Sequence, residues 1–528
     1  MKTFPAIEAT PAEGGWVLTI PRVYWGACDP RWVYLGDQRW GVRTEDGASI
    51  RASGLAPLCT WPDDAAPAEA LPEAHYASTR KPFPHQRQAV QWILDHPATL
   101  LADEQGLCKT LSAIDAVRAR RDLGDAGPVL VVTRRSILPV WEHELHTADP
   151  DYAVGVLKNG KAVPETPWVL ATYDSLGRHL IPDPAFAGKP KPLIPTPDSL
   201  LRRPWHTVIL DEVHAVKNAH ARRTRAILYL QSPYKIMITG TPVINTFSDL
   251  WFPLFWTRQT SLSWWAFLAR YGTPNEWGQW HPKWDRIPEL NRLLLPIEIR
   301  RTKAQTVHLP PKIVQDIPVV LGKRQRAVYT QAKNDWLLET RTHPESLQNP
   351  LVRLLRFKQI TGGLHLVSET ETDHAKWDTF RDLYADALEA GSKIVLYTQF
   401  RDQWQWLMDH CAAWHPVGIR GDTPDADRKT AMQRFQTDPA CQVFVMTRAG
   451  GEGITLTAAQ TIVFFDWEWS PAANDQIADR LHRIGQTGTV NVVRLVAHNT
   501  IDERILHHNL ADKEVLRALL GQAPSQIL

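Results

Sequence analysis

Short, nearly continuous apolar runs recur along most of this chain, and each run ends in a polar turn before a helical pattern begins. A first series comprises PVLVVT (128–133), WVLAT (168–172), TVILD (207–211) and KIMIT (235–239). A second series comprises KIVLYT (393–398), QVFVMT (442–447) and TIVFFD (461–466). Apolar strands of this kind, alternating with helices, are typical of parallel sheets that are covered on both faces. The two series predict two α/β lobes, with a helix-rich stretch at roughly 243–390 between them.

The composition limits the class of protein. Of the 528 residues, 44% are hydrophobic and 22% are charged, which excludes a collagen-like, mucin-like or largely disordered chain. No stretch approaches the ~18 apolar residues of a membrane span, and the start has no apolar signal run, so we expect no membrane association. The five scattered cysteines form no CxxC pair, so we expect no zinc and a reducing compartment. The net charge of +2 does not by itself indicate a nucleic-acid partner.

The N-terminal segment differs from the rest of the chain. Residues 1–62 contain short β-branched and aromatic runs that are broken by Gly, Pro and Asp, which predicts a small β-rich module. Residues 63–80 are rich in Ala, Pro and acidic side chains, and we interpret them as a linker.

The first chemical motif is ADEQGLCKTL (102–111), which follows the apolar run 98–101 and opens a helical pattern. A loop between strand and helix with Gly and then Lys-Thr predicts a phosphate cradle, because backbone N–H groups and the helix N-terminus face the anion. We expect Lys109 to neutralise the β and γ phosphates and the Thr110 hydroxyl to ligate Mg²⁺. Taken alone, the pair would more often be the solvated start of a helix.

A second motif, VILDEVHAVKN (208–218), places two carboxylates at the end of an apolar strand. Asp211 is the expected Mg²⁺ ligand, and Glu212 is the expected general base for the attacking water. In the second series, QIADRLHRIGQ (476–486) spaces Gln476, Arg480 and Arg483 by four and three residues, which predicts one helix face. Arginines from a second lobe stabilise a transferring phosphoryl group in other enzymes. The alternative for this stretch is a solvated basic helix face.

These motifs, in this order, resemble the SNF2 family of superfamily 2 helicases, which are double-stranded-DNA translocases. The resemblance runs from about Phe83 to Ile505. It includes FPHQRQAV (83–90), VVTRRSILPVWEHEL (131–145), VLATYDSL (169–176), ITGTPVINTFSDLW (238–251), RRTKAQTVHLPPK (300–312), YTQF (397–400), RGDTPDADR (420–428) and TRAGGEGITLTAAQTIVFFDWEWSP (447–471). The strings TLTAA and DRLHRIGQ look closest to the annealing-helicase branch, which rewinds or remodels forked DNA.

The resemblance implies an α/β fold with two RecA-like parallel-sheet lobes and helical insertions, following the N-terminal β-rich module. We expect lobe 1 at 81–312 with a helical insertion at about 246–298, a helical insertion at 313–390, and lobe 2 at 391–528 with C-terminal helices.

The resemblance also implies the site residues. The catalytic set is Lys109, Asp211, Glu212, Arg480 and Arg483. The ATP-binding set is Gln86 (reading adenine), Asp103, Glu104, Gly106, Leu107, Cys108, Lys109, Thr110, Gly453 and Gln476. Thr241 is expected to couple the nucleotide state to the DNA grip. The candidate contacts with the DNA backbone are Arg134, Arg135, Lys217, Asn218, Asn245, Arg448 and Trp469. The stripe ARRTR (221–225) is either a further phosphate contact or a solvated helix.

Three positions depart from the family pattern. Cys108 stands where the family has Gly immediately before the Lys, Thr455 stands where many members have Asn, and Ser470 replaces Asn. If position 108 needs a left-handed backbone, a side chain there costs roughly 1–2 kcal/mol. Three interpretations of Cys108 stay open: a tolerated substitution, an impaired ATPase, and a redox-sensitive thiol activated by Lys109 and the helix start.

Tryptophan is unusually frequent, and seven of the 23 Trp fall between Trp251 and Trp284. Clustered Trp more often form the core of a helical insertion than a stacking wedge for bases. We therefore expect a core role for this cluster.

The expected function is an ATP- and Mg²⁺-dependent, DNA-stimulated ATPase that moves on double-stranded or forked DNA, without a need for strand separation. One alternative is a nucleotide-responsive DNA-binding clamp with weak turnover, caused by Cys108. Another is a motor that displaces RNA polymerase or other nucleoprotein, with residues 1–62 binding the protein partner. We expect a cytoplasmic location in a prokaryotic or viral-host setting, or a nuclear one if the source is eukaryotic.

Overall fold

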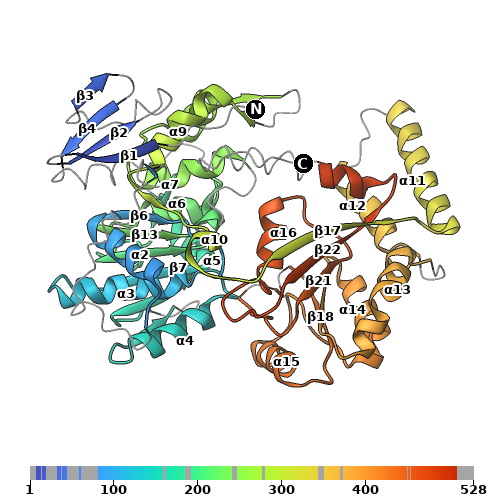
Figure 1. Ribbon diagram of the computed structural model, residues 1–528. Helices are drawn as coiled ribbons and strands as arrows, with labels where there is room; N and C mark the ends of the chain where they lie inside the picture. The colour runs from blue at the N-terminus through green and yellow to red at the C-terminus, as the bar shows by residue number, and fades with distance from the viewer. Residues whose placement is uncertain are drawn as a thin grey trace. The chain divides into compact units, whose positions relative to one another are not determined.

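The computed structural model describes residues 81–507, except for 158–161, 185–191, 241–245, 276–279, 343–349, 369–372, 449 and 452. Five strands before residue 81 are also described, by their backbone alone, and the side chains of 336–351 lie outside the description. The chain divides into two compact units, and the main division falls between Thr302 and Lys303. Figure 1 shows one large parallel sheet in each unit.

The N-terminal strands form a five-stranded sheet in the order β3-β4-β2-β1-β5. Their bounds are β1 (Ile7–Ala12), β2 (Gly15–Thr19), β3 (Val33–Gly36), β4 (Arg39–Arg43) and β5 (Cys59–Thr60). All neighbours pair antiparallel except β1 and β5, which pair parallel. Strands are therefore present in the segment for which the sequence predicts a β-rich module.

Lobe 1 is built on a seven-stranded sheet in the order β16-β6-β13-β12-β7-β9-β8, and every neighbouring pair is parallel. The strands are β6 (Ala98–Leu101), β7 (Val129–Thr133), β8 (Val154–Val156), β9 (Trp168–Thr172), β12 (Thr207–Asp211), β13 (Tyr234–Ile238) and β16 (Glu298–Ile299). The four apolar runs of the first series are strands of this sheet. The short edge strands β8 and β16 were not expected.

Successive residues of these strands enter two separate cores, because side chains alternate across a strand. Leu130 and Val132 pack on one face of β7, and Val129 and Val131 pack on the other. None of the four is more than 2% exposed. This burial on both faces explains why the sequence shows nearly continuous apolar runs.

Helices cover both faces of the lobe 1 sheet (Figure 1). One face is covered by α2 (Pro84–Asp95), α3 (Lys109–Asp122) and α4 (Leu138–Ala148). The other face is covered by α5 (Tyr173–Arg178), α6 (Arg222–Leu228), α7 (Trp251–Trp256), α8 (Trp264–Tyr271) and α9 (Ile287–Leu294). Lobe 1 also contains the 3-10 helices η5 (Val213–Val216), η6 (Phe247–Leu250) and η7 (Trp284–Arg286), and the hairpins β10 (Leu180–Pro182) with β11 (Leu193–Pro195) and β14 (Gly272–Pro274) with β15 (Trp280–Pro282).

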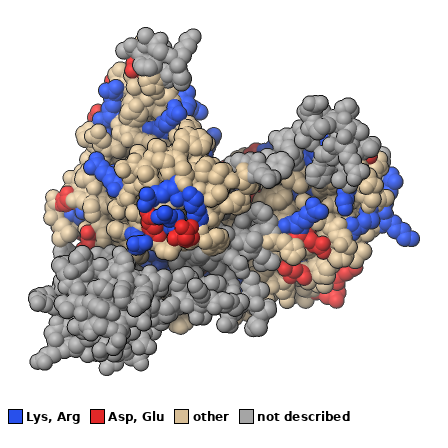
Figure 2. Space-filling model, turned by 90° about the horizontal axis from the view of Figure 1, so that it is seen from above, with Lys and Arg blue, Asp and Glu red and all other residues tan. Residues whose placement is uncertain are grey.

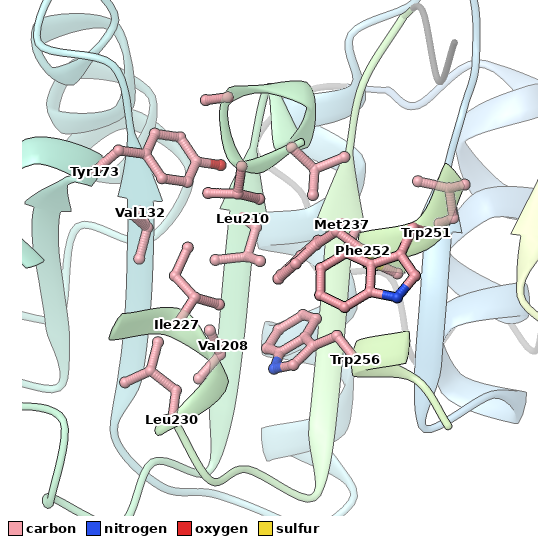
Figure 3. Packing of buried hydrophobic residues seen from close by; sticks show 14 of the residues in the cluster. Val132, Tyr173, Val208, Leu210, Ile227, Leu230, Met237, Trp251, Phe252 and Trp256 are labelled. Carbon is pink, nitrogen blue, oxygen red and sulfur yellow. The ribbon is translucent and has the colours of Figure 1, made fainter. Parts of the chain in front are cut away.

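The tryptophan cluster divides into buried and exposed members. Trp251 and Trp256 pack with Phe252 against Met237 and Val208 in the sheet core, as Figure 3 shows. Trp265 and Trp284 are instead 61% and 57% exposed. The expected core role is therefore confirmed for Trp251 and Trp256, and it is wrong for Trp265 and Trp284.

Lobe 2 contains a six-stranded parallel sheet in the order β17-β22-β21-β18-β20-β19. The strands are β17 (Lys312–Val319), β18 (Ile394–Tyr397), β19 (Val417–Ile419), β20 (Val443–Met446), β21 (Thr461–Phe464) and β22 (Val490–Ala497). All three apolar runs of the second series are strands here. Two parallel-sheet α/β lobes are thus present, as the sequence predicts.

Residues 313–390 were expected to form a helical insertion. That stretch begins with β17, which joins the sheet beside β22, and continues with helices. The helices of this lobe are α10 (Lys303–Thr306), α11 (Lys323–Thr342), α12 (Pro350–Gly362), η8 (Leu364–Leu366), α13 (Ala375–Glu389), α14 (Arg401–His410), η9 (Ala412–Trp414), α15 (Asp425–Thr437) and α16 (Pro471–Ala478). The expected C-terminal helices fall partly on residues 508–528, outside the described residues.

In the described part of the chain, no helix is long and apolar enough to cross a membrane. Among the same residues, no group of three or more His, Cys, Asp or Glu side chains is arranged to hold a metal ion.

A buried and an exposed Trp provide a matched pair of variants for a test of folding stability. Replacing Trp251 by Ala removes a core side chain, and we expect it to lower the free energy of unfolding of lobe 1 by about 3–5 kcal/mol. Trp265→Ala removes a mostly exposed ring, and we expect a change within about 0.5 kcal/mol. Urea unfolding followed by circular dichroism measures both. Equal losses would contradict the division into core and surface members.

Candidate active site

The phosphate loop leaves the carboxyl end of β6 and enters α3 at Lys109. Two backbone hydrogen bonds attach its start to the neighbouring edge strand: Ala102 N–H donates to Ile299 O at 2.9 Å, and Glu104 N–H donates to Arg301 O at 3.0 Å. Lys109 Nζ donates to the carbonyl oxygens of Asp103 (2.7 Å) and Glu104 (3.0 Å). The ammonium group therefore lies over the loop, at the N-terminal end of α3, where an anion would bind.

Cys108 adopts a left-handed backbone conformation, which is the conformation in which a side chain at this position is costly. Its φ and ψ are 55° and 42°, and it is the N-cap residue of α3. Gly106, two residues earlier, also has a positive φ of 86°. A side chain at a left-handed position costs roughly 1–2 kcal/mol, which Gly avoids. The backbone that surrounds the expected phosphate position is therefore strained at Cys108, and the thiol is exposed.

Removing this strain should strengthen nucleotide binding. Because Cys disfavours the left-handed region, a fraction of the protein leaves the binding conformation, and the apparent affinity falls by that fraction. We expect Cys108→Gly to lower the Kd for ATP about fivefold, which corresponds to about 1 kcal/mol. Calorimetric titration with ATP measures this without turnover. Cys108→Ala is the control, because it removes the thiol and keeps Cβ; an equal gain in that variant would assign the effect to the thiol.

The expected metal ligand Asp211 ends β12 and is held by several donors. Its Oδ2 accepts hydrogen bonds from Trp141 Nε1 at 2.7 Å and from Thr133 Oγ1 at 3.0 Å, and its backbone oxygen accepts one from the Tyr173 hydroxyl. Burial, together with the adjacent Glu212 carboxylate, raises the pKa of Asp211 to about 6. A divalent cation bound by Asp211 would offset the repulsion between the two carboxylates and would favour the ionised form of Asp211.

The donor set fits Mg²⁺ better than a metal held by protein ligands alone. Mg²⁺ usually takes one or two carboxylates together with water and substrate phosphates. Asp211, at the end of β12, and Thr110, in the first turn of α3, are the residues expected to supply the protein side of such a site.

The expected base, Glu212, has an unusual backbone. Its φ and ψ are 52° and 54°, so a residue with a side chain occupies the left-handed region, directly after β12. Backbone strain of this kind is often found at functional sites, where the surrounding structure enforces it. The neighbouring His214 has its pKa lowered to about 4, mainly by burial, so its ring is neutral near pH 7.

Gln86, the expected adenine reader, lies on α2. Its Oε1 accepts a hydrogen bond from Phe83 N–H at 2.9 Å, while its Nε2 is buried and makes no hydrogen bond to any described residue. A buried donor without a partner is costly. An adenine ring nitrogen would accept from Nε2, so this residue fits a purine base. The Phe83 ring, 40% exposed, stacks on His85 beside it.

Sequence reasoning missed the role of Arg301. Its guanidinium forms a bidentate ion pair with Asp103, at 2.9 and 2.5 Å, and it also donates to the backbone oxygen of His85. The residue thus connects the phosphate loop to α2, which carries Gln86. The only signals in the sequence were the paired arginines and an acidic residue at position 103.

This ion pair can be tested by removing one charge or both. Asp103 is 1% exposed, so Arg301→Ala leaves a buried carboxylate without its partner, and we expect a loss of about 3–5 kcal/mol in lobe 1 stability. The double variant Asp103→Asn, Arg301→Gln removes both charges and should recover most of that loss. Thermal and urea unfolding compare the two. If the double variant is as unstable as Arg301→Ala, the pair does not carry the stability assigned to it.

The candidate ATP contacts in lobe 2 are arranged differently from the expected single helix face. Helix α16 ends at Ala478, so Gln476 is helical, whereas Arg480 and Arg483 follow the helix. Arg483 is held by Thr455 Oγ1 at 2.7 Å and by Ile454 O at 3.2 Å. The expectation of one continuous helix is wrong, because the chain turns after Ala478 and reaches Gly485 with a φ of 100°. Gly453, in the preceding loop, also has a positive φ of 74°.

The DNA candidates of lobe 1 gather at one sheet edge. Arg134 and Arg135 follow β7, and Lys217 and Asn218 follow β12 and η5; β7 and β12 are neighbouring parallel strands, so their carboxyl ends share an edge. Arg135 and Asn218 are exposed, and Arg134 and Lys217 are partly exposed. Thr241 and Asn245 lie outside the described residues. In the stripe ARRTR, Arg222 donates to Leu180 O at 2.5 Å and Arg223 lies 3.9 Å from Asp174.

The DNA candidates of lobe 2 lie at the carboxyl ends of β20 and β21. Arg448 lies 3.2 Å from Glu468, and the Glu468 carboxylate also accepts a hydrogen bond from the Tyr397 hydroxyl. Trp469 is 36% exposed. On the face shown in Figure 2, Lys and Arg side chains gather in separate patches with Asp and Glu nearby. This distribution agrees with the nearly neutral net charge.

Two protein-family models match this chain. The SNF2-related domain family matches residues 85–362, and the helicase conserved C-terminal domain family matches residues 375–485. An uncharacterized ATP-dependent helicase of Mycoplasma genitalium is 27% identical over 454 residues, which are 83% of this chain and 42% of that protein. Human lymphoid-specific helicase is 26% identical over 505 residues, which are 80% of this chain and 60% of that protein. The chain spans less than two thirds of either relative.

Among solved structures, the SWI2/SNF2 ATPase core of Sulfolobus solfataricus in complex with dsDNA is similar. Its TM-score is 0.40 at 24% identity, with 84% of this chain and 98% of that chain covered. The first family match alone spans more than half of the chain, and the sequence motifs lie in the two matched ranges except for Phe83, Pro84 and Gln486 at the ends of two motifs. The chain therefore belongs to the SNF2-related family of ATP-dependent helicases.

Proposed function

We propose that this protein is an ATP-driven translocase on double-stranded DNA. ATP and Mg²⁺ would bind at the phosphate loop, with Gln86 at the base, Lys109 and Thr110 at the phosphates, and Asp211 at the metal. The single observation that carries the proposal is the geometry of lobe 1. The phosphate loop, the buried carboxylate pair and a group of basic side chains all leave the carboxyl edge of one parallel sheet.

The proposed chemistry is water attack on the γ-phosphate. Glu212 would accept the proton of the attacking water, and the bound metal would neutralise charge on the phosphate oxygens. Arg480 and Arg483 are proposed to stabilise charge on the transferring group, and Thr241 to couple the nucleotide state to the DNA grip. Contacts with the DNA backbone through Arg135, Lys217 and Arg448 would position the duplex without reading its sequence.

The finer parts of the proposal rest on the sequence alone. The strings TLTAA and DRLHRIGQ favour activity on forked DNA of the annealing-helicase kind. The domain limits proposed from the sequence are 1–62, 63–80, 81–312, 313–390 and 391–528; the limit at 312 is the one that moves, because the chain divides between Thr302 and Lys303 and β17 belongs to the lobe 2 sheet. Residues 1–62 are proposed to bind a protein partner. We also propose a cytoplasmic location.

Replacing the proposed base tests the chemistry. Glu212→Gln keeps the size of the side chain and removes its ability to accept a proton, so we expect ATP to bind with little change while kcat falls roughly 10²–10⁴-fold. Calorimetry measures binding, and phosphate release with saturating duplex DNA measures turnover. Glu142→Gln, on the exposed face of α4, is the isosteric control and should keep the parent rate. Hydrolysis at the parent rate by Glu212→Gln would show that another group is the base.

A second candidate function is a nucleotide-responsive DNA clamp with weak turnover. The observation that favours it is the left-handed backbone of Cys108 in the phosphate loop. A clamp would bind duplex DNA and ATP but hydrolyse ATP slowly even with saturating DNA. Restoring glycine in Cys108→Gly would then raise kcat by orders of magnitude, whereas a working motor would gain mainly in ATP affinity.

A further inference from the structure

Arg134 and His214 are in direct contact, although 80 residues separate them in the sequence. The guanidinium Nη2 of Arg134 lies 2.8 Å from the ring Nε2 of His214. Arg134 follows β7, at the edge where the candidate DNA contacts gather, and His214 lies in η5, two residues after Glu212. One of the candidate DNA-binding residues thus contacts a histidine that lies two positions after the proposed catalytic base.

This contact fixes the tautomer of His214. An arginine side chain has only donors, so Nε2 must accept the hydrogen bond and carries no proton. The ring is neutral, so its single proton is on Nδ1. The acceptor role of Nε2 follows from the Arg134 contact alone.

The Nδ1 side of the His214 ring lies beside the proposed catalytic base. Nδ1 lies 3.2 Å from Oε2 of Glu212 and 3.5 Å from the hydroxyl oxygen of Thr239. Both Glu212 and His214 are at most 9% exposed, so water competes little for these positions. Catalytic hydrogen bonds are often long before substrate binds and tighten afterwards. The Glu212 carboxylate is therefore close to Nδ1 without accepting a hydrogen bond from it in this structure, and Arg134 contacts the opposite side of the same ring.

Other charges also surround the ring. Asp249, buried in η6, and Lys217, at the end of η5, both act on His214 electrostatically. Arg134 is the only one of these charged groups that is both within hydrogen-bond distance of Nε2 and partly exposed on the basic edge.

We propose that Arg134 and His214 are positioning residues that link DNA binding to the catalytic base: a DNA phosphate anchors Arg134, Arg134 fixes the His214 ring, and His214 orients the Glu212 carboxylate. The planar guanidinium has five N–H donors, so it can hold a phosphate while Nη2 keeps its bond to His214. The inference rests on the proposed function of a DNA-stimulated ATPase. It gives a route, within lobe 1, by which duplex DNA accelerates hydrolysis.

A double-mutant cycle tests the relay. Arg134→Gln and His214→Asn, made singly and together, are compared at saturating duplex DNA and saturating ATP. We expect each single variant to lower kcat about tenfold, because misplacing a base by a fraction of an ångström is costly. The KM for ATP should hardly change. The double variant should be no slower than His214→Asn alone, because Arg134 acts only through His214.

Arg135→Gln is the matched comparator, since it removes a guanidinium one residue away, on the exposed side of the same edge. We expect it to raise the duplex concentration that gives half-maximal stimulation, while kcat at saturating duplex changes far less than in Arg134→Gln. The relay is overturned if Arg134→Gln behaves in the same way as Arg135→Gln. It is also overturned if the Arg134 and His214 effects multiply in the double variant.

A spectroscopic measurement separates the relay from the proposed function. Long-range ¹⁵N–¹H spectra of the full-length protein, without ATP or DNA, report the tautomer of each histidine, and the His214 signal is the one that His214→Asn removes. We expect the Nδ1–H tautomer in the parent protein and a mixture of tautomers in Arg134→Gln. An Nε2–H tautomer in the parent protein would overturn the relay whether or not the protein hydrolyses ATP. Absence of DNA-stimulated hydrolysis, with the Nδ1–H tautomer present, would instead count against the proposed function.

Discussion

The seven strands of the lobe 1 sheet all run parallel, and this constraint places the chemistry of the lobe at one edge. Each loop that carries candidate site residues leaves the carboxyl end of a strand: the phosphate loop after β6, the carboxylates after β12, and the paired arginines after β7. The sheet can adopt this arrangement because helices bury both of its faces. The same apolar residues that stabilise the lobe therefore determine which polar residues meet.

Two structural costs are concentrated at this edge. Asp211 and Glu212 place adjacent carboxylates in a buried position, and both Cys108 and Glu212 have a left-handed backbone. The surrounding structure supports these positions with specific contacts. Trp141 and Thr133 hold the Asp211 carboxylate, and Arg301 pairs with Asp103 at the start of the phosphate loop. A nucleotide with its metal would supply the positive charge and the hydrogen-bond partners that such a site favours.

The sequence was sufficient to predict the central strands, because a strand buried on both faces must be apolar along its whole length. It did not indicate β16, which has only two residues, or the pairing of β17 with β22, which depends on distant segments. Motif order predicted the residues of the candidate site. It did not predict the contact between Arg134 and His214 or the one between Arg301 and Asp103, because spacing along the chain carries no information about side chains brought together by folding. The helix expected to carry Arg480 and Arg483 ends earlier, since local periodicity does not show where a helix stops.

The central claim is that this protein couples ATP hydrolysis to duplex DNA. The most direct measurement is steady-state ATP hydrolysis by the full-length chain with Mg²⁺, compared without DNA, with single-stranded DNA, with duplex DNA and with a forked duplex. The account predicts slow hydrolysis without DNA and strong stimulation by duplex or forked DNA, with less by single strands. Hydrolysis that is equally slow under all four conditions, although ATP and duplex DNA both bind, would contradict it.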